Sequence, residues 1–315
     1  MKKGIVKILY KLLILGLLFS ILIIYCEVKL REIPSSYIIK KNYFEKNLDS
    51  AEILILGSSQ PLYGINPEYF SLKGFNLAEQ SQSLYYDEKL VSKYIDKMPN
   101  LKFVFITISY FSLWYELYNS VENWRDYFYK KDWQLAINNQ KYIDKNDVSY
   151  IDLYGISFVQ SALLVNFNLP AWTESLRENG WYQNTGRMLI SQNADSSSAL
   201  EIKRQDQAMA DSVFENNKNY LEKLITELTL KKITPVIIIT PVYNTYSMKM
   251  DPNRNKKTEE VINNLCKAPV CRSYNYLNDP RFVLSDFSDT DHLNETGAGK
   301  FSKIINKEII TDLKK

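Results

Sequence analysis

Ile53-Leu54-Ile55-Leu56-Gly57-Ser58-Ser59 is typical of a short buried strand that ends in a sharp turn. Four consecutive apolar residues indicate a strand covered on both faces, as in a parallel sheet between two layers of helices. The glycine marks the point where the chain turns, and the two serines follow it. The stretch therefore predicts a hydroxyl group at the edge of a sheet, with a helix N-terminus behind it.

Outward from this stretch, strand-like and helix-like segments alternate along the chain. The other expected strands are short apolar runs over residues 75–78, 103–108, 235–241 and 282–284. The expected helices have apolar residues three to four positions apart and cover residues 84–97, 205–232 and 297–314. This alternation predicts a three-layer α/β/α fold with a parallel, flavodoxin-like sheet. In such a sheet, the loops at the carboxyl ends of the strands carry the chemistry.

Composition excludes several classes of protein. The 315 residues are 45% hydrophobic and 24% charged, as in an ordinary globular chain, and the net charge is only +3. No basic stripe stands out, so we expect no nucleic-acid partner. Three cysteines and one histidine are too few for a zinc finger, an iron–sulfur cluster or a multi-histidine metal site. We therefore expect no metal and no cofactor, and any imidazole chemistry falls to His292.

The N-terminus predicts a membrane anchor over residues 1–28, followed by a linker over 29–50. Four lysines precede an uncharged run from Leu12 to Cys26, which places the N-terminus in the cytoplasm by the positive-inside rule. A cleaved signal peptide is the competing interpretation, but the flank of the run lacks the small residues of a cleavage site. We expect residues 51–315 to form a domain outside the cytoplasm.

Two cysteines near the C-terminus bear on this location. Cys266 and Cys271 bracket a four-residue loop, and an oxidising compartment would allow a disulfide between them. Two free thiols are the alternative that the sequence leaves open. The sequence gives no indication of oligomeric state.

Residues 110–200 interrupt the alternation and are expected to form an insertion. All five tryptophans (Trp114, Trp124, Trp133, Trp172 and Trp181) lie here, with nine of the 23 tyrosines. Such residues can stack on sugar rings, but a helical insertion also needs a small core of its own. We expect the second arrangement, with the indoles buried and remote from Ser59.

A second chemical motif lies near the C-terminus. Asp289-Thr290-Asp291-His292-Leu293-Asn294 precedes Gly297 and the last expected helix. An aspartate three residues before a histidine on a loop can fold back onto the ring, fix its tautomer and stabilise its protonated form. Each motif alone has an ordinary explanation: Ser59 could simply cap a helix, and the histidine could lie on an acidic surface loop.

Together the motifs resemble the SGNH (GDSL-like) hydrolase superfamily. Its first block, Gly-Asp-Ser after the first strand, corresponds to Gly57-Ser58-Ser59, and its last, Asp-x-x-His before the final helix, to the motif ending at His292. Phe75-Asn76-Leu77-Ala78-Glu79-Gln80-Ser81 is similar to the second block, Asn-x-Gly-x-x-Gly. The resemblance implies Ser59 as nucleophile, His292 as general base and Asp289 as its orienting partner. Activity should then fall as His292 becomes protonated, near its reference pKa of about 6.5 or higher beside a carboxylate.

The sequence departs from the family's pattern in three places. Ser58 replaces the aspartate of the first block, and Ser81 stands where a glycine would donate its backbone N–H to the oxyanion hole. The third block, Gly-x-Asn-Asp, is replaced by Ser109-Tyr110-Phe111-Ser112, which contains no asparagine. The expected oxyanion donors are therefore Ser59, Ser81 and Ser109, and loss of one donor typically lowers the rate about 100- to 1,000-fold.

The anchor, the Gly-Ser-Ser motif and the insertion make the chain similar to superfamily members of the cell envelope. These include alginate O-acetylation proteins and the D-alanyl transfer protein of teichoic acid synthesis. The resemblance implies an esterase or O-acyltransferase that acts on a cell-envelope glycan or an acylated small molecule, beside a membrane-bound O-acyltransferase. The alternative is a weak or inactive protein of the same fold that binds glycans or assists assembly.

Overall fold

The computed structural model describes residues 2–144, 147–155, 175–186 and 193–314, and its centre is a five-stranded parallel sheet. The strand order is β2-β1-β3-β4-β5, with every neighbouring pair parallel, so the predicted flavodoxin-like α/β/α class is confirmed. The strands are β1 (Ile53–Leu56), β2 (Gly74–Asn76), β3 (Phe103–Thr107), β4 (Thr234–Ile239) and β5 (Arg272–Asn275).

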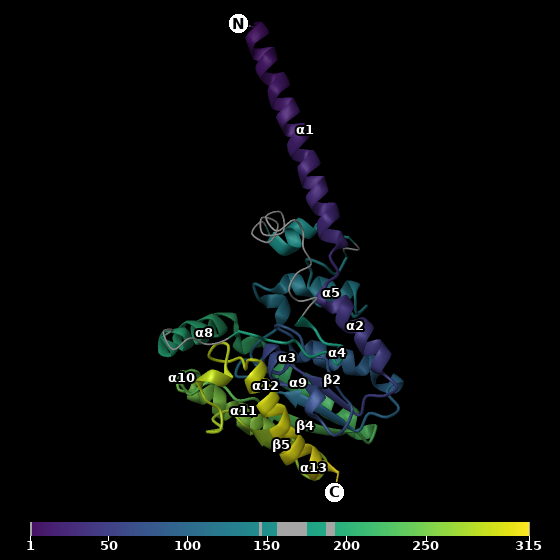
Figure 1. Ribbon diagram of the computed structural model, residues 1–315, viewed down its shortest axis with the longest axis vertical. Coiled ribbons are helices and arrows are strands. Elements are labelled where there is room, and N and C mark those ends of the chain that lie inside the picture. Colours follow the sequence, from purple (N-terminus) through teal and green to yellow (C-terminus); the bar gives the residue numbers. More distant parts are fainter. Residues whose placement is uncertain (1, 145–146, 156–174, 187–192, 315) are drawn as a thin grey trace.

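Helices cover both faces of the sheet (Figure 1). Alternate residues of β1 enter different cores: Leu54 and Leu56 pack in the core that includes the helices α4 and α9, and Ile53 and Ile55 in the core that includes α12. The longer helices are α1 (Lys2–Glu32), α2 (Ser36–Asn47), α4 (Leu84–Tyr94), α8 (Ala194–Ala208), α9 (Phe214–Leu230), α11 (Pro252–Leu265) and α12 (Glu295–Ile305). The shorter ones are α3 (Ser59–Gly64), α5 (Asp126–Lys131), α10 (Asn244–Ser247) and α13 (Thr311–Leu313), with a π-helical turn over Asn306–Ile310.

Two of the predicted elements are wrong. The fifth strand is not 282–284 but Arg272–Asn275, a polar segment at the edge of the sheet, where half-exposed and exposed side chains alternate. Its ladder is made by the backbone, so the strand needs no apolar run to signal it. The helix expected over 205–232 is divided into α8 and α9, with Met209 and Ala210 between α8 and a short 3₁₀ turn.

Residues 29–50 are not a linker. Ser35 caps α2 by accepting a hydrogen bond from the backbone N–H of Ile38 at 3.0 Å. The helix then buries Tyr37 and Phe44 in the same core that contains strand β1. The folded body therefore begins at the end of α1 and includes α2.

The aromatic insertion has no separate core among the described residues. Trp133 packs against Phe44 of α2 and Tyr94 of α4, with ring centroids 6.0 and 5.9 Å apart, and Trp114 packs against Phe214 of α9. These contacts join the insertion to the core of the sheet. The expected burial of the indoles is confirmed for Trp114, Trp133 and Trp181, Trp124 is half-buried, and Trp172 lies outside the described residues.

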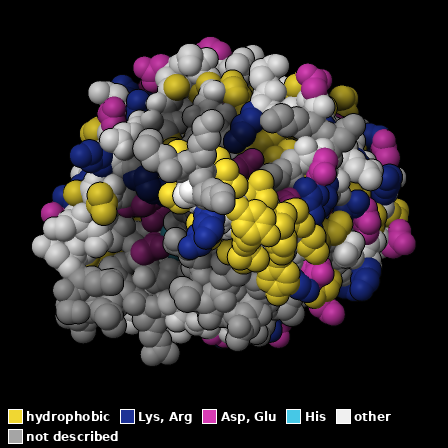
Figure 2. Space-filling view, turned by 90° about the horizontal axis from the view of Figure 1, so that it is seen from above, with side chains coloured by type: hydrophobic (Ala, Val, Ile, Leu, Met, Phe, Trp, Pro, Cys, Tyr) yellow, Lys and Arg dark blue, Asp and Glu magenta, His cyan; other side chains and the backbone are white. Residues whose placement is uncertain are grey.

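Helix α1 projects from the body as a long rod and carries the N-terminus far from the sheet (Figure 1). Its residues 4–25 are all exposed and its most apolar window has a mean hydropathy of 2.5, so it is long and apolar enough to cross a membrane. A signal sequence would meet the same criterion. Viewed from the α1 end, apolar side chains gather in one patch with basic side chains beside it (Figure 2).

The turn after β1 depends on a glycine. Gly57 has φ of +125°, and a Cβ there would lie 2.0 Å from the Oγ1 atom of Thr107 on the neighbouring strand. The Thr107 hydroxyl cannot move away without losing a hydrogen bond, because it donates to the backbone oxygen of Leu56 at 2.6 Å. The N–H of Gly57 donates to the buried carboxylate of Asp87 at 3.1 Å. The turn is therefore held from both sides.

We expect Gly57→Ala to lower the free energy of unfolding by about 3 kcal/mol or more, because it adds a clash to an unfavourable backbone conformation. Gly155→Ala is the matched control: φ is +75° but no atom of the described residues lies within 4 Å of the new Cβ, so the cost should be about 1 kcal/mol. Urea unfolding of the full chain in detergent micelles measures both. Equal losses would show that the turn has room for a side chain.

Candidate active site

Ser59 is the first residue of α3, directly after the Gly57 turn. The chain must leave the sheet here, so the side chain of Ser59 lies at the carboxyl edge of β1 beside a helix N-terminus. Its Oγ atom lies 2.7 Å from Nε2 of His292, which is 233 residues away in the sequence. The hydroxyl of the preceding residue, Ser58, is buried and lies 3.2 Å from Oγ of Ser109 instead.

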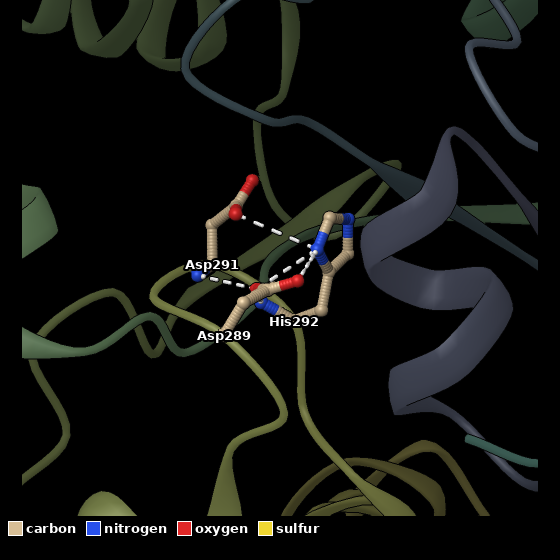
Figure 3. A group of neighbouring side chains, drawn as sticks. All are labelled: Asp289, Asp291 and His292. Carbon is tan, nitrogen blue, oxygen red and sulfur yellow. Dashed lines mark hydrogen bonds and ion pairs between the residues drawn. The ribbon is translucent and has the colours of Figure 1, made fainter. Parts of the chain in front are cut away.

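The ring of His292 is held on its other side by two carboxylates. Nδ1 lies 2.9 and 3.0 Å from the two oxygens of Asp289 and 3.4 Å from an oxygen of Asp291. Both carboxylates approach the same ring nitrogen, and the second nitrogen points away from them (Figure 3). Asp289 also accepts the backbone N–H groups of both other residues, so its orientation is fixed. A proton on Nδ1 satisfies this arrangement and leaves Nε2 free to accept the Ser59 proton.

The two carboxylates differ in burial and in charge. The side chain of Asp289 is half-exposed, and its pKa is lowered because hydrogen bonds and the charge of His292 outweigh partial burial. Asp291 is only 3% exposed, and burial raises its pKa to about 7, although His292 opposes the rise. Burial alone would lower the pKa of His292, but the charges of Asp291 and Asp289 prevail and raise it to about 9. This is well above the reference value.

Asp291 was not predicted as a site residue, although it lies inside the Asp-x-x-His motif. Its carboxylate accepts a hydrogen bond from Nε2 of Gln205 at 3.1 Å. The amide oxygen of that glutamine in turn accepts from the hydroxyl of Tyr246 at 2.5 Å. Gln205 belongs to α8 and Tyr246 to α10. Two helices that are distant in the sequence therefore hold Asp291, the carboxylate that faces the histidine ring. An Asp-His pair is the only local signal, and it does not indicate which helices supply these contacts.

Asp289, Asp291 and His292 also form a group whose ligand atoms lie within 4.8 Å of one another, close enough to hold a metal ion. The hydrogen-bond pattern favours another use. Nδ1 faces carboxylates and serves as a donor, while Nε2 is at hydrogen-bond distance from Ser59. A protonated nitrogen has no lone pair to give to a metal.

The expected oxyanion donors are not all brought to Ser59. Ser81 lines the same cavities as Ser59, and no residue among those described accepts its backbone N–H. Its φ of +57° is the left-handed conformation that favours glycine, which is the residue the family has there. Ser109 is absent from both linings, and its buried hydroxyl is engaged by Ser58 and by Gln60, which it contacts at 2.8 Å. The prediction for Ser109 is therefore not supported.

Two cavities have Ser59 in their linings. The first has a volume of about 530 Å³ and is lined by His292, Asp289 and a set of hydroxyl and amide side chains. The second, of about 190 Å³, contains neither of these two residues in its lining. The residues common to both linings are Ser59, Ser81, Glu122 and Arg204.

Residues 175–186 of the insertion form one wall of the first cavity. This segment lies against the edge strand, where the N–H of Asn76 donates to the oxygen of Asn179 at 2.8 Å. The indole N–H of Trp181 donates to the oxygen of Tyr63 on α3 at 2.8 Å. At the other end, Nδ2 of Asn184 donates to Ser288 at 2.7 Å. The segment thus connects the serine side of the site to the histidine side, a role that its sequence did not indicate.

Asp291→Asn should move the pH dependence of ester hydrolysis to lower pH. Only neutral His292 can accept the serine proton, so kcat/KM in the wild type should rise with pH up to about 9. Removing one negative charge makes the protonated ring less stable, and its pKa falls toward the reference value of about 6.5. Stopped-time assays across pH, corrected for spontaneous hydrolysis, measure the inflection. Asp312→Asn, which removes an exposed partner of Arg272, is the control. An inflection common to all three proteins would contradict this assignment.

Comparisons with known proteins add little to this geometry. No protein-family model matches the chain, and no curated protein matches it. A solved structure from Streptococcus pneumonia, proposed to be a platelet activating factor, is similar over 93% of this chain and 97% of that chain. The sequence identity is 11% and the TM-score is 0.38.

Proposed function

We propose that this protein is a serine-dependent acyl-transfer enzyme that cleaves an ester and passes the acyl group to water or to a hydroxyl. The observation that carries the proposal is the continuous contact from Ser59 through His292 to a fixed carboxylate, with Ser59 in the linings of two cavities. A nucleophile within reach of a base, itself oriented by a third group, is the arrangement that acyl transfer requires.

The steps follow from the tautomer. Nε2 of His292 takes the proton of Ser59 as Oγ attacks the carbonyl carbon, and the positive ring is stabilised by Asp289 and Asp291. As the ester bond breaks, the same Nε2–H protonates the departing alcohol. Water or an acceptor hydroxyl then gives its proton to Nε2 and attacks the acyl group, and Ser59 leaves with the proton. No other residue has to move a proton.

Two backbone N–H groups are the candidates for the oxyanion hole. One belongs to Ser59 in the first turn of α3, where helix N–H groups have no intrahelical partner. The other belongs to Ser81. With Ser109 engaged elsewhere, the site has one donor fewer than the family's pattern, which supports a slow or specialised enzyme.

We propose that the catalytic body lies outside the cytoplasm on a retained anchor. The base of α1 is part of the folded structure: Cys26 and Leu30 are buried in its core. Glu27 accepts the backbone N–H groups of Tyr150 and Ile151 at 2.9 and 3.1 Å, contacts that lower its pKa although partial burial opposes them. Removal of a signal peptide just before residue 27 would delete the buried Cys26 and leave Glu27 at a free N-terminus.

The disulfide supports the same location. Cys266 and Cys271 are bonded, and such bonds persist mainly in oxidising compartments.

The substrate that we propose is an acylated cell-envelope glycan or another ester of a hydroxyl-rich alcohol. The alternative is a non-catalytic protein of the same fold that holds a glycan with its aromatic insertion. The missing asparagine favours this alternative, but three of the four described indoles are buried and Ser59, His292 and Asp289 are in contact.

Ser59→Ala and His292→Ala should each lower kcat/KM for p-nitrophenyl acetate by about 1,000-fold or more, because each removes an indispensable part of one unit. The double variant should be no worse than either single one. Asp289→Ala should retain more activity, because Asp291 still faces Nδ1.

Ser58→Ala is the matched control for this series. It removes a neighbouring hydroxyl that contacts Ser109 and not His292, so kcat/KM should stay within about threefold of the wild type. Wild-type turnover by Ser59→Ala, or an equal loss in Ser58→Ala, would refute the proposal.

The location has its own test. Intact-mass analysis of the protein from the membrane fraction should show a chain that retains residues 2–26. Alkylation without reduction should modify Cys26, the one free cysteine, after unfolding, and leave Cys266 and Cys271 unmodified. A chain that starts near residue 27, or three alkylated thiols, would contradict the proposed topology.

A further inference from the structure

We infer that the two cavities divide the substrate between them: the smaller one takes a short acyl chain and the larger one takes the alcohol. This inference rests on the proposed function, and it specifies the substrate class as a short-chain acyl ester of a hydroxyl-rich alcohol.

The assignment follows from the position of the base. In the tetrahedral intermediate on Ser59, the departing oxygen must lie beside Nε2 of His292, because that nitrogen protonates it. His292 lines the first cavity and is absent from the lining of the second. The alcohol therefore occupies the first cavity. The oxyanion takes a third direction, toward the candidate N–H donors of Ser59 and Ser81, and the acyl chain is left with the second cavity.

Part of the lining of the second cavity suits an apolar group. Its wall includes Phe111, Tyr115 and Ala208, which are half-buried or buried and pack with the core. Two polar residues that reach it are already paired: Gln205 donates to Asp291 at 3.1 Å, and both are more than nine-tenths buried. An acyl chain there would leave these polar groups with their partners.

The volume of the second cavity limits the length of the acyl chain. About 190 Å³ is below the range of about 300 to 1,000 Å³ that drug-sized ligands occupy. A short acyl group fits this space, and a long fatty acyl chain would have to extend into solvent. The second cavity thus selects the acyl group by length.

The first cavity suits a polyol. Hydroxyl and amide side chains from four segments line it: Tyr63 of α3, Gln80 after β2, Gln183 with Asn184, and Ser288. Such groups both donate and accept hydrogen bonds, as the hydroxyls of a sugar require. In a transfer reaction the acceptor hydroxyl must also approach Nε2, so it enters through the same cavity.

The test uses two variants that fill one cavity each. Ala208→Leu should lower kcat/KM for p-nitrophenyl hexanoate at least about tenfold relative to p-nitrophenyl acetate, because the longer chain loses its space. Thr185→Phe, at an exposed position in the first lining, should leave this ratio unchanged. It should instead lower acetate release from glucose pentaacetate, relative to p-nitrophenyl acetate, by a similar factor.

A third variant keeps the proposal testable if Ala208→Leu does not fold. Phe111→Ala enlarges the second cavity and should raise the hexanoate-to-acetate ratio. If Ser59-dependent turnover is present but the ratio is the same in Ala208→Leu, Phe111→Ala and the wild type, or if Thr185→Phe changes it instead, the division of the cavities is wrong. If turnover does not depend on Ser59, the proposed function itself has failed.

Discussion

The lack of space beside Gly57 is the constraint on which the site depends. A strand in the middle of a parallel sheet has neighbours on both sides, and here the neighbouring Thr107 hydroxyl occupies the place where a Cβ would lie. The chain can leave the strand only through a backbone conformation that glycine tolerates. That turn begins α3 at Ser59 and so sets a hydroxyl at the sheet edge. The histidine arrives from the opposite end of the chain, on the loop before α12.

The charges of two carboxylates make His292 a stronger base. Two carboxylates face one ring nitrogen, and one of them is almost completely removed from water, so the protonated ring is favoured although burial alone opposes it. The buried carboxylate is held by α8 through Gln205. The same helix contributes Ala208 to the second cavity. Helix α8 therefore contacts both the carboxylate that raises the pKa of His292 and the cavity in which we propose that the acyl chain lies.

Sequence patterns revealed the elements whose chemistry is local. The apolar runs of β1, β3 and β4 indicate strands buried on both faces, and the spacing of Asp289 and His292 indicates an aspartate folded onto its ring. Strand β5 was not predicted because its side chains are polar and partly exposed, and only its backbone hydrogen bonds make it part of the sheet. Other site residues were not predicted for a different reason. The roles of Asp291, Gln205 and the 175–186 segment come from contacts across the fold, which no local sequence spacing indicates. Residues 29–50 were expected to be a linker, whereas α2 buries Tyr37 and Phe44 through contacts that only the fold supplies.

The most direct test of Ser59 as the nucleophile is the position of a covalent label. A fluorophosphonate reacts with a serine that has an adjacent base and an oxyanion site, and peptide mass mapping identifies the modified residue. We expect one adduct per chain, on Ser59, formed more slowly as the pH falls below about 9 and His292 becomes protonated. No adduct, or an adduct on another serine with Ser59 unmodified, would contradict it.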